Sequence, residues 1–341
     1  MKYSNLFALF LLLLFAPLSL AQNSDAAREF VKRGVQRMQQ RDVEGAIAEF
    51  DKAIAANPRL ALAYMDRGNA RRLKKDLDGA LADHNKAIEL DQSFAPAYSN
   101  RALTKKDRGD FDGALADFDK AIQIEPRDVA SYIGRAQLRQ SKGELDAALA
   151  DYDKALQVNP KYAIAYLNRG TLKRRMGDLD GAIADFDRAA ELDPQLAAAF
   201  ANRGSARQAR GDVGLASEDY ETAIAVSQGK AAGPFLNRGN FKKKNGDLEG
   251  AIADYNSAIE AEPQNPYAYL NRGSARQEKL DLEGAIADFS QAIKFKPDLS
   301  YGYANRGIAL LLQGKDEEAQ QDFEQAIKLE PAMKQIGRAH V

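Results

Sequence analysis

Nine arginines and nine acidic residues recur along the sequence at matched positions, each acidic residue following its arginine by 16. A strip of arginines could bind phosphate or carboxylate groups, because a guanidinium forms paired hydrogen bonds with both. Alternatively, each arginine pairs with an acidic residue in its own folded unit or in a neighbouring one. We favour pairing, because the acidic residue recurs as strictly as the arginine. The arginines are Arg33, Arg67, Arg101, Arg135, Arg169, Arg203, Arg238, Arg272 and Arg306, and the acidic residues are Glu49, Asp83, Asp117, Asp151, Asp185, Asp219, Asp254, Asp288 and Asp322.

Other residues suited to catalysis are scarce. The sequence has no cysteine, which excludes disulfides, thiolate metal sites and a cysteine nucleophile. His84 is the only histidine before the last six residues, and it stands at a position that is otherwise aromatic, so we interpret it as a packing residue. No glycine-rich phosphate loop, nucleophile elbow or HExxH motif occurs. We therefore predict no enzymatic activity, cofactor or metal. A formal net charge of −1 also argues against a nucleic-acid partner.

The spacing of the arginines defines the elements that must position them. Every step between successive arginines is 34 residues, except the 35 between Arg203 and Arg238. The sequence is therefore an array of nine units with one extra residue between Ser227 and Phe235. That residue could kink the array or lengthen a loop, and we favour the longer loop.

Each unit reads as two helices separated by a turn. Gly177-Asp178 and Gly246-Asp247 are two such turns, and the aspartate is well placed to cap the second helix. A single pair of helices cannot bury its apolar face, whereas stacked pairs can, which explains the repetition. We therefore predict an all-α fold of stacked antiparallel helix pairs.

The repeated pattern closely resembles the tetratricopeptide repeat over residues 27–333. Its marks are an aromatic residue and then a small residue in the first helix, and an alanine in the second. The aromatics are Phe30, Tyr64, Tyr98, Tyr132, Tyr166, Phe200, Phe235, Tyr269 and Tyr303; the small residues are Gly34, Gly68, Ala102, Ala136, Gly170, Gly204, Gly239, Gly273 and Gly307; the alanines are Ala46, Ala80, Ala114, Ala148, Ala182, Ala216, Ala251, Ala285 and Ala319. The resemblance implies a right-handed α-solenoid superhelix, with the first helices lining a concave groove.

An asparagine precedes the arginine in six units, and these six form what we call the asparagine ladder. They are Asn100, Asn168, Asn202, Asn237, Asn271 and Asn305. A side-chain amide both donates and accepts hydrogen bonds, so it can bind a peptide backbone without selecting side chains. The ladder resembles that of superhelical members of the family that bind extended peptides. The alternative is that these asparagines face water, and the sequence leaves both interpretations open.

Basic residues accompany the ladder along the same helices, namely Arg72, Lys106, Arg174, Arg175, Lys243 and Lys244. They would suit an acidic, extended polypeptide or a C-terminal carboxylate. The alternative is a solvated charged face balanced by the aspartates of the second helices. The lysine and asparagine spacing of the family's carboxylate clamp is absent, so we do not predict a receptor for chaperone tails.

The two ends of the sequence carry separate expectations. Residues 1–21 combine one lysine, an apolar run from Leu6 to Phe15 and small residues before a cut after Ala21, as in a secretory signal peptide. Residues 22–26 are a short N-terminal segment. The tail at 334–341 ends in Ile336–Val341, which resembles a translated sequencing adapter, so we expect the natural protein to continue past Lys334. The apolar Leu311 and Leu312 also lead us to expect a covering helix, domain or second chain.

We therefore predict a periplasmic or secreted scaffold that binds a protein or peptide in its groove, with no membrane association after signal removal. The alternative is the recognition arm of a larger enzyme, for example a glycosyltransferase, whose catalytic domain lies beyond the C-terminal tail.

Overall fold

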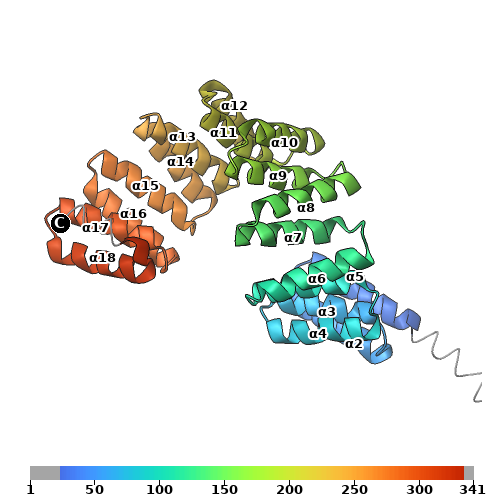
Figure 1. Cartoon of the computed structure of the whole chain (residues 1–341). Coiled ribbons are helices and arrows are strands. Elements are labelled where there is room, and N and C mark those ends of the chain that lie inside the picture. The colour runs from blue at the N-terminus through green and yellow to red at the C-terminus, as the bar shows by residue number, and fades with distance from the viewer. Residues whose placement is uncertain (1–23, 334–341) are drawn as a thin grey trace, which may run out of the picture. The chain divides into compact units, whose positions relative to one another are not determined.

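The computed structural model describes residues 24–333, which fold entirely into helices and short connections (Figure 1). The expected signal peptide and the segment Ile336–Val341 lie outside the described residues. The chain divides into two compact units, residues 1–160 and residues 161–341. The predicted superhelical turn depends on how these units are placed, and it stays a prediction.

The first unit contains four helical hairpins. We call the two helices of each hairpin the first and the second helix. The helices are residues 24–39 and α2 (Val43–Ala56), α3 (Ala61–Leu73) and α4 (Leu77–Leu90), α5 (Ala95–Asp107) and α6 (Phe111–Ile124), and α7 (Val129–Lys142) and α8 (Leu145–Val158).

The second unit contains five further hairpins, and each of its helices from α10 to α17 packs against the helix before it and the helix after it. They are α9 (Ala163–Arg175) and α10 (Leu179–Leu192), α11 (Ala197–Arg210) and α12 (Val213–Val226), α13 (Ala232–Lys244) and α14 (Leu248–Ala261), α15 (Pro266–Glu278) and α16 (Leu282–Phe295), and α17 (Ser300–Leu312) and α18 (Asp316–Leu329), followed by the short 3-10 helix η1 (Pro331–Met333).

The turn inside six of the nine hairpins follows the predicted capping chemistry. Gly177 adopts a left-handed backbone with φ of 89°, which glycine reaches without steric cost. Asp178 then accepts a hydrogen bond from the backbone N–H of Gly181, which would otherwise lack a partner in the first turn of α10. Asp42, Asp76, Asp110, Asp247 and Asp281 cap their helices in the same way.

The core of each hairpin depends on a close approach of its two helices. A Cβ atom on Gly170 would lie 2.8 Å from the ring of Phe186, so only glycine leaves room for that ring. Phe186 and the neighbouring Ala182 are both fully buried. The small residues that mark the repeat therefore act by admitting the large ones of the second helix.

The extra residue lies in the loop between α12 and α13, as predicted. Five residues connect these helices, against four between α10 and α11. Gln228 and Gly229 turn the longer loop through left-handed backbone with φ of 52° and 67°. The helices on both sides keep the lengths of their counterparts, so the insertion lengthens a loop.

The last hairpin is packed less completely than the others. Phe323 is half-buried, whereas the equivalent Phe289 is fully buried beneath the next hairpin. Leu310 is buried, Leu311 is half-buried and Leu312 is 58% exposed. The expected cover for Leu311 and Leu312 stays a prediction.

Candidate functional site

The recurring arginines join acidic residues both within a hairpin and between hairpins. Arg67 on α3 donates from Nε and Nη2 to the carboxylate of Asp83 on α4, at 2.9 and 2.6 Å. Its Nη1 donates to Asp51 of the preceding hairpin at 2.6 Å. The paired hydrogen bonds to one carboxylate are the geometry that makes arginine–carboxylate contacts strong. One guanidinium thus holds three helices.

The same contact within the hairpin occurs in all nine hairpins, which confirms the predicted pairing. Eight arginines lie 2.5–2.7 Å from the acidic residue 16 positions later, and Arg33 lies 3.4 Å from Glu49. These arginines are therefore not a strip of unpaired cations for phosphate.

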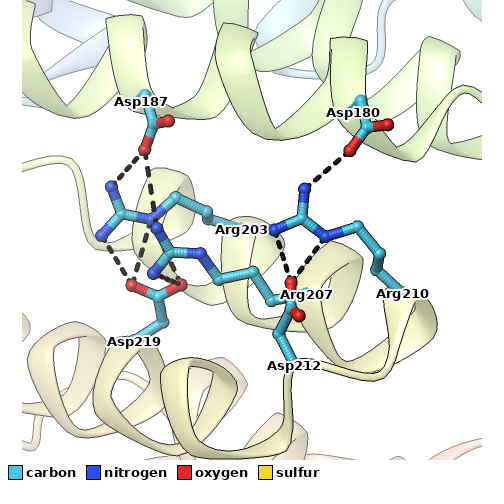
Figure 2. A network of polar contacts seen from close by, with 7 residues as sticks. All are labelled: Asp180, Asp187, Arg203, Arg207, Arg210, Asp212 and Asp219. Atoms are coloured by element: carbon cyan, nitrogen blue, oxygen red, sulfur yellow. Dashed lines mark hydrogen bonds and ion pairs between the residues drawn. The ribbon is translucent and has the colours of Figure 1, made fainter.

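Figure 2 shows this network at the contact between α10 and α11. Arg203 donates to Asp219 and, from Nη1, to Asp187 at 2.6 Å, while Arg207 donates to the second oxygen of Asp219 at 2.9 Å. The Asp219 side chain is only 3% exposed. Burial opposes the charge on Arg203, but the hydrogen bonds to Asp219 and Asp187 outweigh it and raise the pKa of its guanidinium. Arg203 therefore stays charged.

Two further charge patterns escaped the sequence analysis. The first is a cation four residues after the arginine, which binds the same buried acid in seven hairpins: Arg71, Lys105, Arg139, Lys173, Arg207, Lys242 and Arg276. The second joins successive hairpins through residues 30 apart: Lys74–Glu44, Arg108–Asp78, Lys142–Asp112, Arg210–Asp180 and Lys279–Glu249. Both patterns are constant spacings in the sequence. An alignment of the cations at every repeat position would have revealed them.

The asparagine ladder lies on half-buried positions of the first helices. The side chains of Asn100 and Asn202 donate back to Pro96 and Ala198 on their own helices, each at 2.9 Å. Asn271 donates to Asn240 of the preceding first helix at 3.0 Å. Asn168, Asn237 and Asn305 are half-buried and have no hydrogen-bond partner for their side chains among residues 24–333. The ladder is thus divided between internal bonds and amides left for a ligand.

The predicted basic residues also divide. Arg72 pairs with Asp107 on the next first helix at 2.8 Å. Lys106 and Arg174 are half-buried and have no ion pair within the described residues, and Arg175 is exposed near the end of α9. Lys243 pairs with Glu278 at 2.8 Å, and Lys244 is exposed without an ion pair in the described part.

A pocket between α13 and α15 brings together two of the predicted residues, Lys243 and Lys244. It has a volume of about 350 Å³ and is lined by Asn240, Lys243, Lys244 and Glu278. Lys243 also donates to Ser274 at 2.8 Å, which holds its ammonium group at the pocket. Two cations and one carboxylate leave the lining positively charged. The pocket can therefore accept a carboxylate, phosphate or carbonyl oxygen.

A larger pocket of about 590 Å³ lies at the loop before α15. Its lining includes Pro263, Pro266 and Tyr267, together with Glu262, Gln264 and Asn265. Tyr267 is 46% exposed and accepts a hydrogen bond from Lys296 at 2.8 Å. None of the predicted site residues lines this pocket, so we place the candidate site at the smaller one.

His84 is a packing residue, as predicted. It is fully buried, with Nε2 at 3.2 Å from Asn69 Oδ1 and Nδ1 at 3.3 Å from Thr104 Oγ1. Burial, followed by the charge of Arg72, lowers its pKa to about 4, so the ring is neutral at neutral pH. His84 therefore fills the place that phenylalanine or tyrosine fills in other hairpins.

Residues 24–333 contain no group of three metal-binding side chains. Within the same residues, no helix is both long and apolar enough to cross a membrane.

Helical hairpins that pack one on the next within each unit, each with the same arginine–acid pair between its two helices, define a protein of the α-solenoid class. Profiles described as TPR repeat match residues 137–177 and 239–279, and profiles described as tetratricopeptide repeat match residues 31–94, 95–128, 163–196 and 300–332. Together they cover more than half of the chain. The chain therefore belongs to the tetratricopeptide repeat family, as its sequence predicted.

The fold is similar to that of solved tetratricopeptide proteins. Yeast Tom70 matches with a TM-score of 0.56 and 15% identity, over 89% of this chain and 92% of that one. A tetratricopeptide repeat protein from Parabacteroides merdae matches with a TM-score of 0.56 and 17% identity, over 84% of this chain and 99% of that one. No curated protein matches the sequence. The chain is thus a scaffold of the kind that binds proteins and peptides.

Proposed function

We propose that this protein is an exported scaffold that binds an extended, acidic polypeptide along the first helices. The observation that carries the proposal is the pocket between α13 and α15, where Lys243 and Lys244 meet Asn240. In the same unit, the half-buried Arg174 adds a positive charge on α9, and in the first unit Lys106 adds one on α5. Unpaired asparagine amides beside these cations supply hydrogen bonds to a peptide backbone.

The acidic preference follows from which charges are already neutralised. The nine recurring arginines are paired with acidic residues, which neutralise their charge within the fold. Lys244 and Arg174 have no ion pair within residues 24–333, so their charge is available to a ligand. Exposed charges attract over about 10 Å at moderate ionic strength, so the attraction should weaken as salt rises.

The binding test uses three capped twelve-residue peptides that alternate glycine with glutamate, glutamine or lysine. Fluorescence anisotropy against the full chain should give the tightest binding for the glutamate peptide, and this binding should weaken between low and moderate salt. Equal affinity for all three peptides, or affinity independent of salt, would refute the acidic preference.

A matched pair of variants locates the binding. Lys243→Gln with Lys244→Gln should weaken the glutamate peptide by about fivefold, the size expected when two solvent-exposed charge contacts are lost. Lys120→Gln with Lys154→Gln removes the same charge from exposed positions on second helices, where each lysine contacts only a glutamine three residues on. This control should bind as the wild type does.

Export rests on the sequence of residues 1–21 and is tested separately. A fusion of residues 1–30 to a reporter that is active only outside the cytoplasm should be active, and the mature protein should begin at Gln22. Leu12→Arg interrupts the apolar run and should abolish the activity. An active Leu12→Arg fusion, or an inactive wild-type fusion, would refute export.

A further inference from the structure

Two buried tyrosines of the second unit reach from a second helix to a side-chain amide on a first helix. The hydroxyl of Tyr220 on α12 donates to Gln208 Oε1 on α11 at 2.8 Å. The hydroxyl of Tyr255 on α14 donates to Asn240 Oδ1 on α13 at 2.8 Å, and the same oxygen accepts from Asn271. We call these two contacts the tyrosine–amide pairs.

Packing fixes the hydroxyl of each pair in place. Tyr220 is 1% exposed and Tyr255 is fully buried, because their rings fill the core position of Phe186 and Phe289. Burial raises the pKa of both hydroxyls above the ordinary tyrosine value. Each hydroxyl therefore stays protonated at neutral pH and acts as a donor to the amide oxygen.

A side-chain amide has one oxygen that accepts and one NH2 group that donates. The oxygen of Asn240 accepts from both Tyr255 and Asn271, which occupies its two lone pairs. The oxygen of Gln208 is directed at the hydroxyl of Tyr220, so its NH2 group is the part that faces away from that contact. Neither Gln208 Nε2 nor Asn240 Nδ2 has an acceptor among residues 24–333. Asn240 lines the pocket with Lys243 and Lys244, and Gln208 occupies in α11 the position that Lys243 occupies in α13. The free donor of Asn240 therefore lies at the candidate site, and that of Gln208 lies at an equivalent position of the preceding first helix.

The sequence itself follows this pattern. Tyr152 in α8 faces Gln140 at 3.4 Å, and His84 in α4 faces Asn69 at 3.2 Å. A polar-tipped ring in the second helix is thus accompanied by an amide in the first helix in all four cases. The reverse does not hold throughout: Phe118 and Phe186 stand in hairpins that carry Lys106 and Arg174 at the position of Gln208, whereas Phe289 stands in a hairpin that carries Gln277 there.

We propose that Tyr220 and Tyr255 orient Gln208 and Asn240 so that their NH2 groups face the bound polypeptide, and that these amides therefore select carboxylate and carbonyl oxygens over N–H donors such as ammonium and amide NH2 groups. This inference rests on the proposed function, and it makes two core tyrosines positioning residues for the bound polypeptide. A tyrosine in the core then acts on specificity without touching the ligand.

The first experiment measures the ratio of affinities for the glutamate and glutamine peptides. Tyr220→Phe and Tyr255→Phe remove one hydroxyl each and leave the ring in the core. Tyr220→Phe should reduce the preference for glutamate about threefold to fivefold, because the freed Gln208 amide can turn its oxygen to the ligand. Tyr255→Phe should reduce it less, because Asn271 still donates to the oxygen of Asn240. Tyr269→Phe is the matched control, since its hydroxyl donates to the backbone of Pro263 and holds no amide. Its ratio should equal that of the wild type.

A second variant adds a tyrosine–amide pair. The α15–α16 hairpin carries Ser274, Gln277 and Phe289. These are the positions that Ser205, Gln208 and Tyr220 occupy in the α11–α12 hairpin. Phe289→Tyr therefore places a hydroxyl opposite Gln277 and should increase the preference for glutamate about threefold. Unchanged ratios in all three variants would overturn the inference.

A measurement on the free protein separates the inference from the proposed function. In 15N spectra of selectively labelled protein, the side-chain NH2 of Gln208, whose oxygen accepts only from Tyr220 within residues 24–333, should be ordered in the wild type and mobile in Tyr220→Phe. Equal mobility in both would overturn the inference whatever the peptides do. If the wild type binds none of the three peptides, the proposed function fails, and the role in ligand selection fails with it.

Discussion

Two contacts between successive hairpins of the second unit are built from different chemistry. Between α10 and α11, Arg203 reaches Asp187 and Arg210 reaches Asp180, each at 2.6 Å (Figure 2). Between α12 and α13 the equivalent positions hold Arg238 with Glu221 and Asn245 with Gly214. Within residues 24–333 neither of these pairs forms a hydrogen bond or ion pair, although the charge of Glu221 still contributes to the raised pKa of Arg238.

The α12–α13 contact relies instead on an aromatic pair. Phe241 stands where Ala206 and Ala275 stand in the neighbouring hairpins, and its ring lies 5.6 Å from that of Tyr220 at an angle of 57°. Apolar burial is strong but non-directional, whereas paired hydrogen bonds between charged groups fix an orientation. Neighbouring hairpins of one fold are therefore held by directional ion pairs at one contact and by apolar burial at another.

The largest loss of stability is expected when the ionic contact between α10 and α11 is broken. Arg203→Ala removes bonds to both Asp219 and Asp187 and should cost about 2–3 kcal/mol, because Asp219 is buried and keeps only its bond to Arg207. Arg238→Ala removes bonds to Asp254 alone and should cost about 1 kcal/mol less. Urea unfolding of both variants measures the difference, and equal losses would show that the bond to Asp187 contributes nothing.

The contact between α4 and α5 extends the comparison to a titratable group. Burial lowers the pKa of His84 to about 4 in the folded chain. Between pH 6.5 and 4 the unfolded chain therefore binds a proton at this residue, whereas the folded chain does not. Stability should fall between pH 6.5 and 4 by about 1–3 kcal/mol from this group. His84→Phe should lose this component in urea unfolding at pH 7 and 4.5. Tyr152→Phe, which changes no group that titrates there, should keep the wild-type dependence.

Two helical glycines separate packing from backbone effects. Gly170→Ala places a Cβ 2.8 Å from Phe186 and should cost about 1–3 kcal/mol through overpacking. Gly214 has no neighbouring atom within 4 Å of such a Cβ, so Gly214→Ala should stabilise α12 by about 1 kcal/mol. Thermal melts should shift in opposite directions, and a shared direction would contradict this account of the hairpin core.

The smallest expected effect adds the missing ion pair. Gly214→Asp with Asn245→Lys restores at α12–α13 the pair that Asp180 and Arg210 form between α10 and α11. An exposed pair of this kind contributes about 0.2–1 kcal/mol beyond the gain from replacing glycine. Hydrogen exchange in the first turn of α12 and the last turn of α13 should slow in the double variant relative to both singles. Additive effects of the two substitutions would exclude the pair.

The fold was predictable because the same residue pattern occurs in each of the nine repeats. The arginine and the acid 16 residues later predicted their contact, and Asp178 predicted its cap, since spacing along helices fixes which residues meet. The sequence showed Asn240 and Tyr255 too, but not that they touch. Whether an amide presents its oxygen or its NH2 group depends on contacts between helices, and the same dependence left the asparagine ladder ambiguous.

The arginine contacts have a consequence for how such a protein changes length. Asp187 accepts a hydrogen bond from Arg203 of the following hairpin. Asp119 accepts one from Arg135 and Asp51 one from Arg67 in the same way. A gene segment encoding 34 residues could therefore be lost or duplicated between matching points, and the newly adjacent hairpins would still complete one another's carboxylates. An array of this design can evolve by whole repeats, because the buried acids are paired within their own hairpin and the contacts between hairpins re-form at the new junction.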